Sequence, residues 1–296
     1  MKVFVTGSES FIGKVLLERC RNTNVDAFGI DLCAPRTVDR APADIRSAEV
    51  ADLIPDGTDA LIHLAAISRD ADARANPRLA YDINVMGTVN LIEAAKARGV
   101  KQFVFASSEW VYGDVANQDI QTEDRPIDIT RLKSEYAFTK IAGEQILKFA
   151  HAQGFPSMTI LRFGIVYGPR MQNWSAVESL LNAVYKGGPV KVGSRASARR
   201  FIHVNDISNG ILASLGRQGC DIFNLSGDRL ITLGDLIDEG ARALGTTVAV
   251  NETAPDAVSI RNPDNTKVRK ALNWEPAFNL VRGVSDVLEC FRAKGN

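Results

Sequence analysis

Short apolar runs alternate with amphipathic segments along the first half of the chain. Residues 2–6 are apolar and β-branched, which predicts a buried strand, and residues 11–21 have the spacing of an amphipathic helix. Similar strand-like runs, separated by helix-like segments, occupy residues 25–30, 59–66, 101–106 and 157–163. Runs that are apolar on both faces are typical of parallel strands covered by helices. The pattern therefore predicts an α/β fold.

The strict alternation loosens near residue 164. Beyond it, helices at 176–186 and 206–215 mix with short strands at 189–192 and 199–203. A small mixed remainder comprises residues 221–224, 233–244, 247–250, 267–272 and 280–292. We expect one domain over residues 1–165, with later segments returning to it, and a second, smaller mixed region over residues 166–296.

Composition narrows the possible partners. The 296 residues include 35 basic and 35 acidic side chains, so the net charge of zero argues against nucleic acid as a partner. No apolar run approaches the length of a membrane span, and because the chain enters a strand at once, we expect no signal peptide. The four cysteines lie far apart and lack metal-binding spacing. We expect a cytoplasmic protein that binds neither a metal nor a membrane.

The turn between the first strand and the first helix suggests a dinucleotide site. Glycines at Gly7 and Gly13 would let the backbone approach a pyrophosphate, and the helix N-terminus would supply N–H groups. Asp31 ends the second strand, about 20 residues further on, where an acidic residue suits the ribose diol of NAD. NAD is therefore the expected cofactor, although Arg36 keeps NADP as an alternative.

Tyr136 and Lys140 are four residues apart, which on a helix places both side chains on one face. An ammonium beside a phenol favours the phenolate, so we expect a lowered tyrosine pKa and a base able to take a proton from an alcohol. The same spacing also occurs in ordinary amphipathic helices. Ser107, Ser108 and Glu109 follow a strand, and the carboxyl ends of such strands face the ligand crevice.

Together these residues make the chain resemble the extended short-chain dehydrogenase/reductases, in particular the NAD-dependent nucleotide-sugar epimerases and dehydratases. Residues 6–13 resemble the family's Thr-Gly-x-x-Gly-Phe-Ile-Gly, and residues 107–113 resemble its catalytic Ser-Ser-x-x-Val-Tyr-Gly. Further matches, in order along nearly the whole chain, are Asp44-Ile45, residues 63–66, residues 84–88, residues 161–170 and residues 199–206.

The resemblance implies a Rossmann-type doubly wound parallel sheet that holds NAD and a smaller C-terminal region that holds the nucleotide sugar. It implies that Tyr136 is the base, that Lys140 binds the nicotinamide ribose and that Ser108 bonds the reacting oxygen. Glu109 is either a substrate-orienting carboxylate or a solvated loop charge. A homodimer is expected, paired through the helices that carry Asn84 and Tyr136.

The remaining residues that the resemblance assigns fall into two sets. The cofactor set is Gly7, Ser10, Phe11, Ile12, Gly13, Asp31, Asp44, Ile45, Leu64, Ala65, Ala66, Ser107, Tyr136 and Lys140. The substrate set is Ser108, Glu109, Trp110, Ile165, Arg199 and Arg261.

Three departures from the family pattern shape the functional prediction. Ser10 replaces the middle glycine of the turn, and Ile165 stands where many relatives carry a sugar-contacting Asn. Trp110 cannot supply the acid or base that a 4,6-dehydratase needs at that position. We therefore expect a 4-epimerase that works through a transient 4-keto sugar. The alternatives are a nucleotide-sugar 4,6-dehydratase, a 4-ketosugar reductase, a sugar dehydrogenase and a non-enzymatic NAD-binding sensor.

Overall fold

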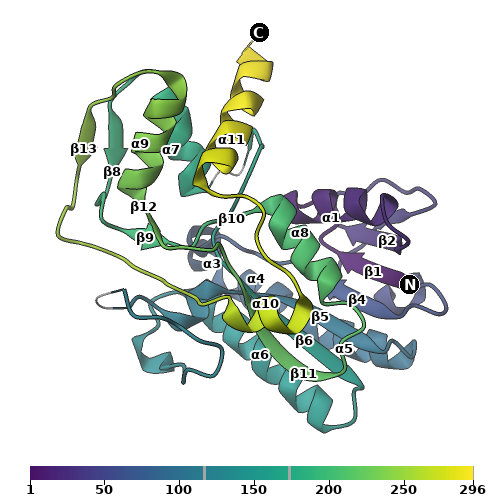
Figure 1. Ribbon diagram of the computed structural model, residues 1–296. Coiled ribbons are helices and arrows are strands. Elements are labelled where there is room, and N and C mark those ends of the chain that lie inside the picture. Colours follow the sequence, from purple (N-terminus) through teal and green to yellow (C-terminus); the bar gives the residue numbers. More distant parts are fainter. Residues whose placement is uncertain (116–117, 173–174, 296) are drawn as a thin grey trace. The chain divides into compact units, whose positions relative to one another are not determined.

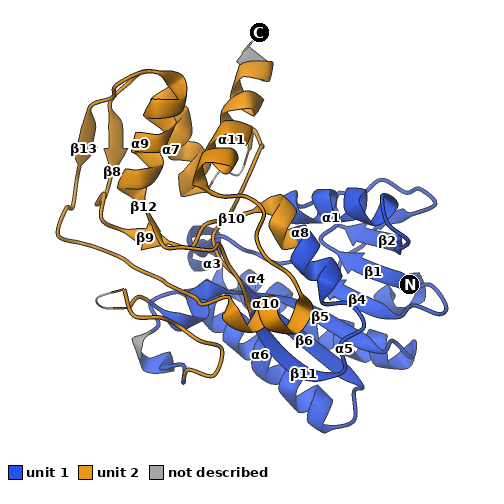
Figure 2. Ribbon diagram, viewed as in Figure 1, with its two compact units in different colours: residues 1–113, 126–162, 208–223 blue, residues 114–125, 163–207, 224–296 orange. Residues whose placement is uncertain are grey.

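The computed structural model describes residues 1–115, 118–172 and 175–295. The chain forms two compact units, which Figure 2 shows in different colours. Unit 1 comprises residues 1–113, 126–162 and 208–223, and unit 2 comprises residues 114–125, 163–207 and 224–296.

The segment 114–125 differs from the expected division at residue 165, because it belongs to unit 2. Its backbone is bonded to a late part of the chain. The Val115 N–H donates to the Ile260 carbonyl at 2.9 Å, and Gln121 forms a parallel bridge with Pro263. These long-range pairings, which leave no local pattern in the sequence, decide the assignment.

Unit 1 is built on a seven-stranded sheet with the order β11-β6-β5-β4-β1-β2-β3 (Figure 1), and the neighbouring pairs from β3 to β5 are parallel. The strands are β1 (Lys2–Thr6), β2 (Asp26–Asp31), β3 (Arg40–Pro42), β4 (Ala60–His63), β5 (Gln102–Ser108), β6 (Ser157–Phe163) and β11 (Gly219–Leu225). The helices are α1 (Phe11–Arg21), α2 (Val50–Leu53), α3 (Asp70–Ala75), α4 (Pro77–Tyr81), α5 (Gly87–Ala97) and α6 (Glu135–Ala152). This doubly wound arrangement confirms the predicted fold class.

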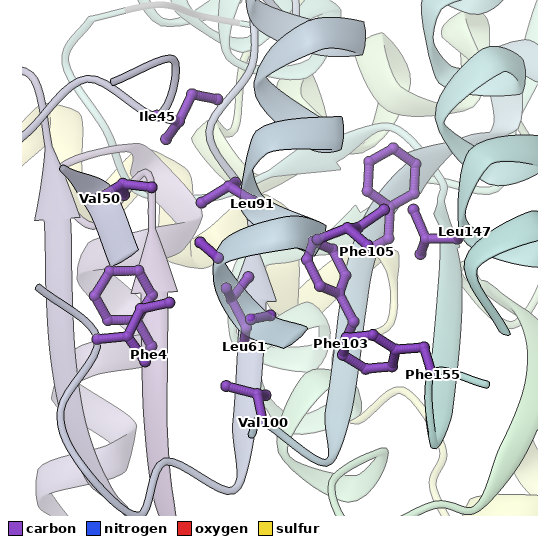
Figure 3. Close-up of a cluster of buried hydrophobic side chains, with 14 of the residues drawn as sticks. Phe4, Ile45, Val50, Leu61, Leu91, Val100, Phe103, Phe105, Leu147 and Phe155 are labelled. Atoms are coloured by element: carbon purple, nitrogen blue, oxygen red, sulfur yellow. The ribbon is translucent and has the colours of Figure 1, made fainter. Parts of the chain in front are cut away.

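The main core of unit 1 lies on one face of this sheet (Figure 3). Alternate residues of a strand point to the same face, so β5 contributes both Phe103 and Phe105, beside Leu61 of β4. Leu91 of α5 and Leu147 of α6 cover these side chains. Each fully buried aliphatic or aromatic side chain stabilises the fold by roughly 1.5–3 kcal/mol relative to its exposed state. Figure 1 shows α1 on the opposite face.

The helical segment that follows Asn76 is not uniform. Between α4 and α5 the residues Asp82–Met86 form a π-helical turn, which widens the helix by one residue. The buried Asn84 sits in this turn, and its amide accepts from the Ile67 N–H at 2.8 Å and donates to the Thr139 hydroxyl at 3.0 Å. The turn therefore places the Asn84 side chain against α6, the helix that carries Tyr136. The hydrogen bond to Thr139 holds this helix in position.

Unit 2 has a separate core formed by three helices and the short strands beside them. Its strands pair as β7 with β10, β8 with β13 and β9 with β12. The helices are α7 (Ala176–Tyr185), α9 (Leu233–Leu244), α10 (Thr266–Leu272) and α11 (Leu280–Gly295), and α8 (Val204–Ala213) leads from unit 2 into unit 1. The strands are β7 (Val166–Tyr167), β8 (Val190–Val192), β9 (Ala198–Arg199), β10 (Ile202–His203), β12 (Ile231–Thr232) and β13 (Val250–Glu252). Within the described part of the chain, none of the helices combines the length and the apolar character that crossing a membrane requires.

Candidate functional site

The turn between β1 and α1 has the geometry that a pyrophosphate requires. Gly7 has φ +75°, and a Cβ there would lie 2.7 Å from the Ala65 nitrogen, so both conformation and space require glycine. A Cβ on Gly13 would collide with the Gly7 carbonyl oxygen. Ser10, the departure from the family glycine, is the N-cap of α1, and its Oγ accepts from the Gly13 N–H at 3.0 Å. The serine therefore stabilises the start of the helix without filling the turn.

Asp31 is held at the end of β2 by two backbone donors. Its Oδ2 accepts from the Glu9 N–H and its Oδ1 accepts from the Cys33 N–H, both at 3.2 Å. The side chain stays partly exposed, as a partner for a ribose diol must. Nearby, the Arg40 guanidinium bonds Glu9 at 2.8 Å, so this cation already has a carboxylate partner. The arrangement fits NAD better than a cofactor with a 2′-phosphate.

The other predicted cofactor residues differ in their surroundings. Asp44 is paired with Arg46 at 2.5 Å, and the hydrogen bonds from Arg46 lower the pKa of Asp44. Ile45 is buried in the unit 1 core, where a Cβ on Gly87 would touch its side chain. Residues 64–66, which follow β4, are partly exposed and small enough at Ala65 and Ala66 for a flat ligand to approach.

His63 is a structural residue. Its ring is fully buried, with Nδ1 2.8 Å from the Thr6 hydroxyl and Nε2 3.1 Å from the Thr88 hydroxyl. Burial holds the pKa of His63 well below its usual value, so the ring is neutral. It ties β4 to β1 and to α5.

Unit 1 brings the predicted catalytic residues together. Ser108 ends β5, and Tyr136 and Lys140 lie one turn apart on α6, all three buried. The Ser108 hydroxyl is a hydrogen-bond partner of the Tyr136 phenol, and the Lys140 Nζ lies 5.8 Å from the centre of the Tyr136 ring. Trp110 meets the same ring edge-on at 6.5 Å between centroids. The tyrosine thus sits between a hydroxyl, an amine and an indole.

Burial, rather than Lys140, dominates the protonation of this site. Burial raises the pKa of Tyr136 to about 12, and the Ser108 hydrogen bond opposes this only in part. Burial also lowers the pKa of Lys140 to about 7, against the attraction of Glu144. The expected lowering of the Tyr136 pKa is therefore wrong for the chain alone, because burial raises this pKa and only the Ser108 hydrogen bond opposes it.

Glu109 is not a solvated loop charge. It begins the 3₁₀ turn Glu109–Tyr112 directly after Ser108, and none of its surface is exposed. Burying a carboxylate is costly unless other groups stabilise it. The solvated role is therefore wrong, and the role of a substrate-orienting carboxylate stays a prediction.

A buried ion pair, to which the sequence motifs gave no role, supports the site. Arg162 of β6 binds Glu144 of α6 through two bonds, Nε to Oε1 at 2.9 Å and Nη2 to Oε2 at 2.7 Å. The Ser107 hydroxyl donates to Glu144 Oε1 at 2.5 Å, and Arg162 Nη1 donates to the Tyr112 hydroxyl at 2.8 Å. The sequence feature that could have revealed the role of Glu144 is the spacing of Tyr136, Lys140 and Glu144, which puts all three on one helix face.

The predicted substrate residues outside unit 1 separate into two groups. Ile165 is partly buried against the core of unit 2. Arg199 and Arg261 lie together around Asp114, with Arg199 Nη2 3.8 Å and Arg261 Nε 3.2 Å from its Oδ1. Unit 2 therefore presents two clustered guanidinium groups, the donors that phosphate oxygens favour.

The doubly wound sheet and the glycine turn of unit 1 define the class of dinucleotide-binding proteins. A family model described as the NAD dependent epimerase/dehydratase family matches residues 3–226. The chain belongs to this family, which uses NAD as its cofactor.

Individual relatives agree with the family match. The chain is 32% identical to a UDP-glucuronate 4-epimerase of Thermodesulfobacterium geofontis over 76% of this chain and 70% of the relative. It is 28% identical to a UDP-glucose 4-epimerase of Mycolicibacterium smegmatis over 99% of both. The solved structure of MoeE5 in complex with UDP-glucuronic acid and NAD has a TM-score of 0.88 and 25% identity, covering 99% of both chains. Other relatives are a UDP-glucuronic acid decarboxylase and a dTDP-glucose 4,6-dehydratase.

We predict that removing one partner of the buried ion pair destabilises the protein strongly. Arg162→Met leaves the Glu144 carboxylate buried without its counter-charge, which we expect to cost about 3–5 kcal/mol in the free energy of unfolding. Arg195→Met, which breaks an exposed pair with Asp238, should cost less than about 1 kcal/mol. Urea unfolding of both variants measures the difference, and the double variant Glu144→Leu/Arg162→Met should recover most of the loss. Equal, small losses in the two single variants would contradict this account.

The lowered pKa of Lys140 predicts how stability depends on pH. The pKa of Lys140 is about 7 in the folded chain and 10.5, its ordinary value, in the unfolded chain. Between these two pH values the unfolded chain binds a proton that the folded chain does not. The contribution of Lys140 to stability should therefore rise with pH in this window, by at most about 1.4 kcal/mol per pH unit. Urea unfolding of the nucleotide-free protein at pH 7 and pH 9, compared with Lys140→Met, measures this slope. A difference between the two proteins that does not change with pH would refute the lowered pKa.

Proposed function

We propose that the protein is a UDP-sugar 4-epimerase. The observation that carries this proposal is the buried set of Ser108, Tyr136 and Lys140 beside a turn shaped for a dinucleotide. The names of the two relatives described above, both 4-epimerases of UDP-sugars, support this choice of reaction and substrate.

In the proposed reaction, Tyr136 takes the proton from the C4 hydroxyl of the sugar while Ser108 donates a hydrogen bond to the same oxygen. When bound, NAD would supply the acceptor and later the donor of a hydride. After the ketone at C4 has presented its other face, Tyr136 would return its proton to the same oxygen as the hydride returns to C4, which would give the inverted alcohol. Lys140, whose pKa is about 7, can hold a positive charge beside the phenolate at neutral pH.

The residues that would hold the cofactor all belong to unit 1. Gly7, Ser10 and Gly13 shape the pyrophosphate turn, and Asp31 would bind the adenosine ribose. Lys140 would bind the nicotinamide ribose. These assignments, and the cytoplasmic location expected from the sequence, remain predictions.

Glu109 and Trp110 would determine which reaction follows oxidation at C4. Dehydration requires a base for the C5 proton and an acid for the C6 hydroxyl. The indole of Trp110 supplies neither, and its ring packs on Tyr136. A buried Glu109 and the indole of Trp110 together suit an epimerase better than a 4,6-dehydratase.

Replacing the proposed base tests the mechanism. Tyr136→Phe removes the hydroxyl but keeps the ring that packs on Trp110, so we expect the protein to fold and kcat to fall by about 10²–10⁴-fold. NMR of the products formed from UDP-glucose and UDP-glucuronate measures the rate and the reaction together. Unchanged turnover in Tyr136→Phe would contradict the assignment of the base.

The identity of the product separates the alternatives in the same experiment. Inversion at C4 supports the proposal. A 4-keto-6-deoxy sugar would indicate a dehydratase, and a UDP-pentose with release of CO₂ would indicate a decarboxylase. No reaction with UDP-, dTDP-, GDP- or CDP-sugars would favour a ketosugar reductase, a sugar dehydrogenase or a sensor.

We also propose a homodimer that pairs through α4, α5 and α6 of unit 1. Three large apolar side chains of these helices and the π-turn are exposed, with fractions of 58% for Met86, 42% for Phe138 and 57% for Phe149. Exposed apolar surface on adjacent helices is typical of an association face.

Sedimentation at micromolar concentration tests the dimer. We expect the wild-type protein to be dimeric and Phe138→Glu/Phe149→Glu to be monomeric, because two carboxylates would have to be buried in the interface. Val38→Glu is the matched control, since Val38 is 99% exposed on the same unit. A monomeric wild-type protein would contradict the proposed dimer.

A further inference from the structure

Three donors of unit 2 converge on one carboxylate oxygen. Asp114 Oδ1 accepts from the Ser259 hydroxyl at 2.8 Å and lies 3.2 Å from Arg261 Nε and 3.8 Å from Arg199 Nη2. Two guanidinium groups and a hydroxyl around one anionic oxygen reproduce the environment that proteins offer to a phosphate oxygen.

The guanidinium groups of Arg199 and Arg261 are held in place, whereas the Asp114 carboxylate is accessible to solvent. The side chains of Arg261 and Arg199 are 9% and 15% exposed, while that of Asp114 is 51% exposed. Arg199 is also held by Ser259, to whose carbonyl and hydroxyl oxygens it donates at 2.6 Å. The two donors would therefore keep their positions if another anion replaced the carboxylate.

We propose that Asp114 is an internal competitor for the diphosphate of the substrate, occupying the place of a phosphate oxygen on Arg199 and Arg261 until the nucleotide displaces it. This inference rests on the proposed function, because it assumes a nucleoside diphosphate sugar as the substrate. A diphosphate carries at least two negative charges where Asp114 carries one, so the exchange favours the nucleotide. The carboxylate compensates the two arginines in the free protein and lowers their affinity for anions with a single charge.

A purely structural role for Asp114 predicts the opposite effect of its removal. If the carboxylate only holds the two guanidinium groups in place, then removing its charge loosens them and weakens nucleotide binding. If it competes with the nucleotide, then removing its charge strengthens binding. The direction of the change therefore separates the two roles.

Calorimetric titration of the NAD-loaded protein with UDP measures this direction. Asp114→Asn keeps the size of the side chain and should lower the Kd for UDP by about threefold to tenfold, the range expected from two ion pairs at a partly exposed carboxylate. Asp119→Asn is the matched control, because it removes the same charge from an exposed position of the same segment, and its Kd should stay within about twofold of wild type.

Each result decides a different question. An unchanged or higher Kd in Asp114→Asn, with normal binding by the wild-type protein, overturns the competitor role and leaves the proposed function standing. Equal tightening in Asp119→Asn also overturns it, because the effect would then come from net charge alone. Failure of UDP to bind the folded wild-type protein and both variants overturns the proposed function, and with it this inference.

Discussion

The ion pair between Glu144 and Arg162 is the constraint on which the catalytic half of the protein depends. Both side chains are almost completely removed from water, at 3% and 2% exposure, so each needs the other to remain charged. The two parallel bonds fix the rotation of α6 against β6, and Tyr136 lies two turns earlier on the same helix face. Ser107 donates to the same carboxylate, which sets the position of its neighbour Ser108. One charged pair therefore aligns the hydroxyl and the phenol.

The burial that makes this alignment rigid also determines the protonation of Tyr136 and Lys140 in the protein without a ligand. Tyr136 and Lys140 have both lost solvation, and each is pushed toward its neutral form. A pairwise argument from their spacing considers only attraction, and it therefore reaches the wrong sign for the tyrosine. The rings around Lys140, with Phe105 4.8 Å from its Nζ, are part of the cause. Forming a phenolate in this site therefore has to overcome the cost of burial.

Features that depend on short stretches of sequence could be predicted, while those that depend on distant partners could not. The β1–α1 turn and the helix of Tyr136 follow from local periodicity and glycine placement, and both agree with the structure. The π-turn at Asn84 has no composition of its own, because its residues also suit a regular helix. Ile165 was predicted to meet a substrate from a motif position, but its packing against the unit 2 core depends on residues far along the chain.

Charge balance explains why the arginines of unit 2 need an internal partner. The chain has no net charge, so it cannot attract an anionic substrate through its overall field. Attraction must then come from particular side chains. Two neighbouring guanidinium groups without a negative charge beside them would repel each other and would bind any small anion. In the proposed exchange, the half-exposed carboxylate of Asp114 would reduce both problems, because its single charge would yield only to an anion of higher charge. Selectivity for a diphosphate can thus arise from a difference of one or more charges, without any contact that recognises the nucleotide itself.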